Sequence, residues 1–126
     1  MVLRRMVVMS WFCLMILASP VCADQALMVK GMEAQKAGRN EEALKLLNEY
    51  VDRYPQVREA RYYRALALNG LGRHKEALED VDMALADNPH NINFLLAKGN
   101  ILVALERRPE AILIYTQAMQ CDPRSA

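Results

Sequence analysis

Apolar residues recur at helical spacing in six segments of the chain. In one segment Leu44, Leu47 and Val51 fall on the same side of a helix, three or four residues apart. Glycine or proline separates most of the segments, as is common where helices end. The pattern predicts an all-α chain. The predicted helices cover residues 25–37, 41–53, 57–70, 74–87, 92–105 and 109–121.

The chain after residue 23 consists of three similar units of equal length. When the units are aligned, Ala43, Ala77 and Ala111 coincide, and each ends the pattern Arg-x-x-Glu-Ala. Small residues and prolines recur in the same register, at Gly31, Ala65 and Gly99, and at Pro55, Pro89 and Pro123. The units cover positions 24–57, 58–91 and 92–125. Each unit holds two predicted helices, and each helix pair buries its remaining apolar face against the next pair.

A repeated helix–turn–helix unit of about 34 residues with this pattern resembles the tetratricopeptide repeat. The middle unit matches the family signature at Ala65, Leu68, Ala77, Val81, Ala84 and Pro89, and the third at Leu95, Gly99, Leu102, Ala111, Tyr115, Ala118 and Pro123. The first unit departs from it at Ala34 and Tyr50. The resemblance implies an all-α, right-handed solenoid of three hairpins over residues 24–126. It also implies a non-catalytic module that binds proteins.

Several residues between the helices carry local signals. Gly38 and Gly72 suit the left-handed turn that follows a first helix. Asn40 is predicted to cap the second helix, and Pro109 is predicted to take the first position of the last one. These signals place the same boundaries as the apolar pattern.

The segment 1–23 differs in composition from the rest of the chain. Arg4 and Arg5 precede an apolar run over residues 6–18, and small residues end the segment before Asp24, the first acidic residue. This order is typical of a secretory signal peptide, and we expect cleavage after Ala23. The alternative is an uncleaved anchor, although a helix of that run spans only about 20 Å of the ~30 Å hydrocarbon core.

Under both interpretations the rest of the chain is exported, because Arg4 and Arg5 stay inside. The expected location is a bacterial periplasm, or the outer face of the inner membrane if the segment remains attached. An endomembrane protein is the alternative. The membrane is a partner only in the uncleaved case.

The charge of the chain argues against a nucleic-acid partner. The formal net charge is +1, and removal of Arg4 and Arg5 lowers it to −1, whereas nucleic-acid binders carry a large basic excess. The hydrophobic content of 53% excludes a disordered chain. Without Cys13 and Cys22 only Cys121 remains, so no internal disulfide can form. Cys121 has no nearby histidine and is interpreted as an inert or occasionally dimer-forming thiol and not as a nucleophile.

Residues that would suit catalysis or a metal are scarce. His74 and His90 lie in different helix-end regions without further ligand clusters around them. Glu79, Asp80 and Asp82 are interpreted as the solvated outer face of a helix. No glycine-rich phosphate loop is present in the sequence. The sequence therefore predicts no enzymatic activity, no cofactor and no metal.

The first helices of the three units are predicted to line the inner surface of the solenoid. In the family that the chain resembles, this surface binds extended peptides or short helices. Tyrosine and methionine side chains suit such a surface. Each residue could instead belong to the core, because the assignment depends on helix rotation. The predicted groove residues are Met28, Met32, Tyr62, Tyr63, Leu66, Asn69, Leu96, Asn100 and Val103, with Val29, Gln35 and Ala97 in the same rungs.

One subtype of the family can be examined on the sequence. Its chaperone-binding members clamp a C-terminal carboxylate with Lys, Asn and Arg on their first helices. The matching places here hold Met28, Met32, Tyr63, Asn93 and Ala97, so the two cationic positions of the last unit are absent. This departure argues against a heat-shock co-chaperone.

The last predicted helix is unusually apolar. Leu113 and Ile114 stand where the middle unit has Glu79 and Asp80, and only Arg124, Ser125 and Ala126 follow Pro123. We therefore expect no further helix over this end, and predict an interface for weak homodimerisation or for a partner helix. The alternative function is a structural subunit that associates with itself through this end. The alternatives are a slightly apolar end or a truncated chain. The predicted open-end residues are Ile112, Leu113, Ile114 and Met119.

Overall fold

The computed structural model describes residues 20–122 and 124. In this part of the chain the structure consists of helices joined by short turns, as the apolar pattern predicted. The all-α prediction of three hairpins is confirmed. The helices are α2 (Pro20–Lys36), α3 (Asn40–Arg53), α4 (Arg58–Gly70), α5 (His74–Asp87), α6 (Ile92–Ala104) and α7 (Arg108–Cys121).

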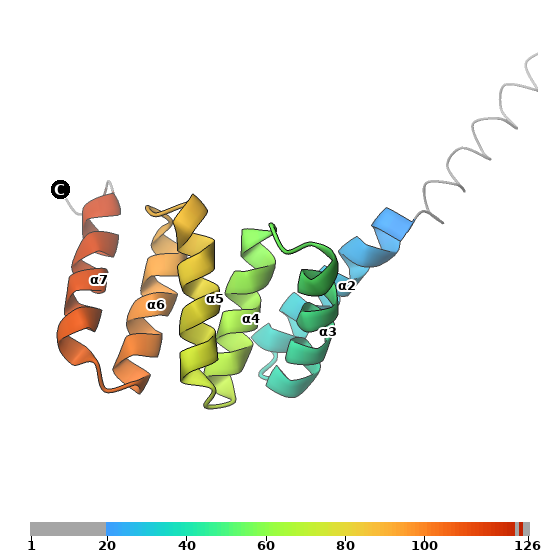
Figure 1. Cartoon of the computed structure of the whole chain (residues 1–126), viewed down its shortest axis with the longest axis horizontal. Helices are drawn as coiled ribbons and strands as arrows, with labels where there is room; N and C mark the ends of the chain where they lie inside the picture. Colours follow the sequence, from blue (N-terminus) through green and yellow to red (C-terminus); the bar gives the residue numbers. More distant parts are fainter. Residues whose placement is uncertain (1–19, 123, 125–126) are drawn as a thin grey trace, which may run out of the picture.

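The three hairpins follow one another in chain order, from α2 and α3 at one end to α7 at the other, and α2 crosses behind α3 in this view (Figure 1). They pair as α2 with α3, α4 with α5, and α6 with α7. The first helices of neighbouring hairpins also touch one another, α2 with α4 and α4 with α6. The row therefore curves toward α2, α4 and α6, and we call the face that these three helices present the inner surface.

The hairpins share a core of small and aliphatic side chains. Ala43 and Ala77 are fully buried, and Ala111 is 1% exposed, where the second helix of each hairpin meets the first. Larger residues fill the space between hairpins, with Leu47 buried beside Ala67, and Val81 beside Ile101. Each hairpin completes its core only against a neighbouring hairpin. Such contacts between repeats are the usual basis of stability in repeat proteins.

The turn inside each hairpin has one residue in the left-handed region. Gly38 and Gly72 both have φ of 80°, as predicted. The third turn holds Glu106 in the same register, with φ of 61°. A side chain makes this conformation costly, so the third hairpin contains a strained residue where the other two have glycine.

The repeated Arg-x-x-Glu-Ala pattern forms an ion pair at the start of each second helix. Arg39 pairs with Glu42 at 3.1 Å, Arg73 with Glu76 at 2.6 Å, and Arg107 with Glu110 at 2.5 Å. Each arginine occupies the N-cap position, and its partner lies in the first turn. Each arginine side chain therefore points toward the first turn of its helix, where the glutamate lies.

Two predicted helix starts need correction. Asn40 is not a cap, because α3 begins at Asn40 itself and Arg39 takes the N-cap position without a side-chain hydrogen bond. The Asn40 amide instead lies against Gly70 of α4, where a Cβ atom would collide with it. Pro109 is the second residue of α7 and not the first, since this helix begins at Arg108.

The beginning of α2 is held by the end of the first hairpin. Asp24 is 8% exposed and accepts hydrogen bonds from Arg53 and from the Tyr54 hydroxyl. The Tyr54 hydrogen bond, followed by the Arg53 contact, holds the pKa of Asp24 below its usual value. Residues 1–19 of the predicted signal peptide lie outside the described residues, so that prediction stays a prediction. Within residues 20–122 and 124, no helix has the length and apolar character needed to cross a membrane.

Candidate protein-binding surface

The inner surface carries the predicted groove residues at two depths. Three of them are exposed, namely Leu96 at 41%, Val103 at 44%, and Asn100. The others are half-buried: Met28, Met32, Tyr62, Tyr63, Leu66 and Asn69. Val29 of α2 is 50% exposed, whereas Ala97 of α6 is buried. A ligand on this surface would therefore meet apolar side chains from α2, α4 and α6.

Tyrosines form the centre of the inner surface. The Tyr62 ring lies 5.0 Å from the Tyr63 ring and 5.2 Å from the ring of Phe94, which is a core residue of α6. Burial raises the pKa of the Tyr62 hydroxyl above its usual value. Lys36 lies over the Tyr63 ring, 5.8 Å from its centre. The second and third hairpins share one cluster of buried residues from α4 to α7, which we call the main core. Tyr62 and Leu66 also pack on this main core, so they support the fold as well as the surface.

Amide groups at one edge of the surface are already oriented. Asn69 Oδ1 lies 2.6 Å from His74 Nδ1 in a hydrogen bond. The Tyr115 hydroxyl donates a hydrogen bond to Asn100 Oδ1. Both contacts engage the amide oxygen, which leaves the amide NH₂ groups to donate to a ligand.

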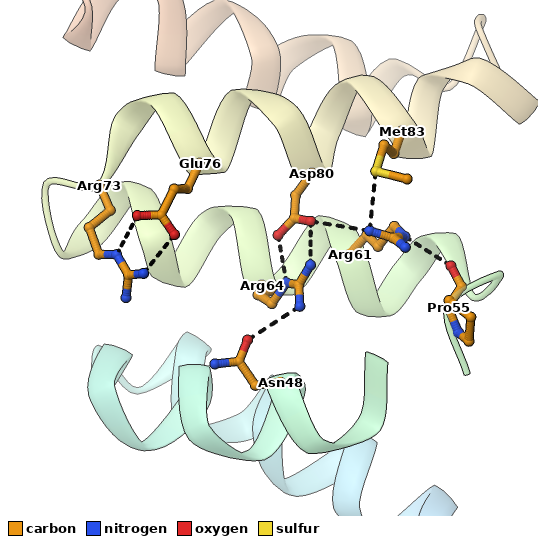
Figure 2. A network of polar contacts seen from close by, with 8 residues as sticks. All are labelled: Asn48, Pro55, Arg61, Arg64, Arg73, Glu76, Asp80 and Met83. Atoms are coloured by element: carbon orange, nitrogen blue, oxygen red, sulfur yellow. Dashed lines mark hydrogen bonds and ion pairs between the residues drawn. The ribbon is translucent and has the colours of Figure 1, made fainter. Parts of the chain in front are cut away.

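The acidic group on α5 is not the solvated face that the sequence suggested. Glu79 and Asp82 are exposed, but Asp80 is only 4% exposed. Arg64 of α4 donates two hydrogen bonds of 2.6 Å to its carboxylate, and Arg61 approaches it at 3.4 Å (Figure 2). The interpretation was wrong for Asp80 because this position of α5 points toward α4.

The Asp80 cluster also joins two hairpins. Arg64 donates a hydrogen bond of 3.3 Å to Asn48 of α3, as Figure 2 shows. The carboxylate of Asp80 raises the pKa of Arg64 above its usual value. Because both arginines engage the Asp80 carboxylate and Arg64 also binds Asn48, we interpret the cluster as a structural contact between helices.

Cys121 has a histidine close by, contrary to the interpretation of the sequence. Its Sγ lies 3.7 Å from His90 Nδ1, and both belong to a shallow cavity with Pro89, Gln117 and Gln120. The contact brings together residues from the second and third units. Among the described residues, no group of three or more His, Cys, Asp or Glu side chains could hold a metal ion.

Three of the four predicted open-end residues are exposed on α7. Ile112 is 64% exposed, Leu113 is 65% exposed, and Met119 is 63% exposed. Ile114 differs, because it is half-buried and packs against the main core. It occupies the same place in the third unit as Asp80 in the second, so it points toward the preceding helix as Asp80 does. Ile114 therefore does not belong to the exposed face of α7.

Comparison with known proteins agrees with this architecture. The tetratricopeptide repeat family model matches residues 28–92, and the chain belongs to this family. A curated relative, Suppressor of RPS4-RLD 1 of Arabidopsis thaliana, is 41% identical over 54 residues. The match covers 43% of this chain and only 5% of that protein, so the chain spans a small part of the relative's length.

Solved structures show the same fold. A MamA structure (MSR-1) has a TM-score of 0.74 at 24% identity, covering 87% of this chain and 63% of that chain. The TPR2B domain of yeast Sti1, in complex with pHsp70, has a TM-score of 0.74 at 22% identity, covering 80% and 81%. The first TPR of Spaghetti (RPAP3), bound to the HSP90 peptide SRMEEVD, has a TM-score of 0.73 at 25% identity, covering 79% of each chain.

Proposed function

We propose that this protein is a non-catalytic protein-interaction module that binds an uncharged, apolar peptide or helix of a partner on its inner surface. The observation that carries the proposal is the apolar surface shared by α2, α4 and α6, with Val29, Leu96 and Val103 exposed on it. Two structural neighbours were solved with peptides or partner segments, which supports the general mode of action. Repeat arrays commonly use their concave face for such binding.

The chemistry of the inner surface selects against acidic C-terminal peptides. Asn93 and Ala97 occupy the two places where a carboxylate clamp would need cations, and Ala97 is buried. Lys36 already lies over Tyr63. Apart from Lys36, the side chains named on this surface are aliphatic, aromatic or amide groups, which recognise an apolar segment through burial and a few hydrogen bonds.

Photo-crosslinking in the native host tests the proposal. A crosslinking amino acid replaces Leu96 or Val103 on the inner surface, and Glu79 on the exposed side of α5 serves as the matched control. We expect a defined partner to be captured from the two inner positions but not from Glu79. Capture that is equal at all three positions, or from Glu79 alone, would contradict binding on the inner surface.

Binding of the captured partner provides the quantitative measurement. Leu96→Ser combined with Val103→Ser should weaken it by at least tenfold, because apolar side chains exposed in the free protein lose their burial in the complex. These residues suit the test better than Tyr62 and Leu66, which also pack on the core. The peptide SRMEEVD is the negative probe, and we expect it to bind no better to the wild-type chain than to the double variant.

For its location, we propose export and a scaffolding role in assembly of the cell envelope. Support comes from the basic, apolar and small-residue order of residues 1–23. N-terminal sequencing of the protein recovered from fractionated cells should give Asp24 as the first residue. Recovery of the intact N-terminus from the cytosol would contradict export, whereas recovery from the membrane would favour the uncleaved anchor.

A further inference from the structure

Helix α7 exposes apolar residues at positions that are covered in the other two hairpins. Ile112 corresponds to Leu78 in the register of the repeat, and Met119 corresponds to Leu85. Leu78 packs on the main core and Leu85 is 9% exposed, because α6 covers this side of α5. The same side of α3 is covered by α4, where Val51 is 3% exposed. The exposed face of α7 therefore continues an interface that the chain forms twice internally.

The polar part of that interface is missing from α7. In the first two hairpins, Asn48 and Asp82 bind cations of the following helix, with Arg64 donating to Asn48 and Lys98 lying 2.7 Å from Asp82. The corresponding residue of α7 is Thr116, whose hydroxyl donates a hydrogen bond to the Ile112 carbonyl. A partner that brings a cation to this place would find neither the amide nor the carboxylate that receives the cation in the first two hairpins.

This difference separates two ways in which copies of the chain can meet. In head-to-tail continuation, α2 of a second copy would cover α7 as α4 covers α3. Its Lys30 and Glu33 correspond to Arg64 and to the fully buried Ala67. Both charges would then be buried against uncharged residues, which is costly. The exposed side of α2 is therefore a poor match for α7.

We infer that the exposed face of α7 pairs with α7 of a second copy, antiparallel and about a two-fold axis near Thr116. From residue 111 to residue 121 the helix has no charged residue, so two copies meet without repulsion. Ile112 and Met119 lie on either side of Thr116, and an antiparallel pair places Ile112 of one copy against Met119 of the other. Leu113 widens the apolar stripe where α5 carries Glu79.

The pairing is weak and leaves the inner surface free. One helix of 14 residues on each side forms an interface at the small end of the range for protein contacts. We therefore expect a dissociation constant of about 10 μM to 1 mM. The inner surface belongs to α2, α4 and α6, so a dimer would present two copies of it.

Sedimentation at several protein concentrations tests the pairing. The full chain is expressed with its own N-terminal segment and purified after any processing by the cell. We expect a monomer–dimer equilibrium in which Ile112→Glu with Leu113→Glu raises the dissociation constant at least tenfold. Val103→Glu, which changes an exposed apolar residue of α6, is the control and should leave it unchanged. A wild-type chain that stays monomeric at protein concentrations up to about 1 mM would overturn the inference. A dimer that tolerates both glutamates would overturn it as well.

Disulfide trapping tests the antiparallel geometry. Thr116→Cys is introduced with Cys13, Cys22 and Cys121 changed to Ser, and an added oxidant should give a covalent dimer. Glu79→Cys in the same background is the control and should remain monomeric. Equal trapping at both positions, or no trapping at Thr116→Cys, would overturn the two-fold arrangement. In the sedimentation experiment, growth of the wild-type chain beyond the dimer would overturn it as well and would indicate head-to-tail contacts.

Discussion

Gly31 of α2 and Leu47 of α3 fit together without room for another carbon atom. A Cβ atom on residue 31 would lie 2.8 Å from Leu47 Cγ and 2.9 Å from Cδ2. Leu47 is fully buried and cannot turn away. At the same crossing the middle hairpin has Ala65 opposite Val81, which is smaller than leucine, and both residues are fully buried. The first two hairpins thus keep one total volume at this crossing and divide it differently between two helices, whereas the third pairs Gly99 with the larger Tyr115.

This volume match predicts that two unfavourable substitutions compensate each other. Gly31→Ala should lower the free energy of unfolding by about 1–3 kcal/mol through overpacking, less the ~1 kcal/mol that alanine gains in a helix. Leu47→Val should cost about 1 kcal/mol. The double variant has the alanine and valine of the middle hairpin. Its loss in free energy of unfolding should be smaller than the sum of the losses of the two single variants. Urea unfolding of the four proteins measures the coupling, and additive losses would contradict the match.

A second prediction concerns the buried charges of the middle hairpin. Asp80→Ala leaves Arg61 and Arg64 facing each other without a carboxylate, and should lower the free energy of unfolding by about 3–5 kcal/mol. The third hairpin has Leu95, Lys98 and Ile114 at the corresponding places.

Copying that arrangement provides the control. The triple variant Arg61→Leu, Arg64→Lys and Asp80→Ile removes the Asp80 carboxylate together with the Arg61 cation and keeps one cation at position 64, as the third hairpin does at Lys98, so most of the stability lost in Asp80→Ala should return. Thermal and urea unfolding compare the two variants. If the triple variant is as unstable as Asp80→Ala, the network contributes more than the mutual neutralisation of its charges.

Glycine should stabilise the third turn. Glu106 has φ of 61°, whereas Gly38 and Gly72 hold the corresponding positions at 80°. Glu106→Gly should therefore raise the free energy of unfolding by about 0.5–1 kcal/mol, because the left-handed conformation costs a side chain about 1–2 kcal/mol and glycine has more freedom to lose on folding. The melting temperature measures the gain. Gly72→Ala should have the opposite sign, and an equal sign for both would contradict this account.

Acid should remove the contribution of the ion pairs at the helix starts. Hydrogen bonds from Arg73 and Arg107 hold the pKa values of Glu76 and Glu110 below the usual 4.5. A carboxyl group with a lowered folded-state pKa adds stability that is complete above its unfolded value and is lost as pH falls through the folded one. The stability difference between wild type and Glu76→Gln with Glu110→Gln should therefore be constant near neutral pH and shrink below about pH 4.5. Urea unfolding across this range measures it, and a difference that grows in acid would contradict the assignment. Because both pairs are exposed, the whole difference is small.

The sequence predicted the helices and the repeat well because both are periodic signals. Apolar residues every three or four positions mark the helices, and Gly38 and Gly72 mark their ends. The rotation of one helix about its axis was harder to predict. Treating Asp80 as an outer residue also placed Ile114 on the outside, since the two share one position in the repeat.

A signal for the buried charges was nevertheless present in the sequence. Arg61 and Asp80 both stand where the other two units have aliphatic residues, namely Leu27 and Leu95, and Leu46 and Ile114. A simultaneous change to opposite charges on paired helices indicates an ion pair that replaces an apolar contact. The Cys121–His90 contact carried no such signal, because it depends on how the third hairpin is placed on the second.

The contact of Arg64 with Asn48 recurs one unit later as Lys98 with Asp82, so the same bond joins each hairpin to the one before it. A directional polar bond tolerates little sliding, whereas aliphatic side chains can repack after a shift of one helical turn. These two contacts therefore favour one register between neighbouring hairpins, in addition to the apolar packing. If the inner surface binds a partner as proposed, a surface held in one register would need little ordering on binding.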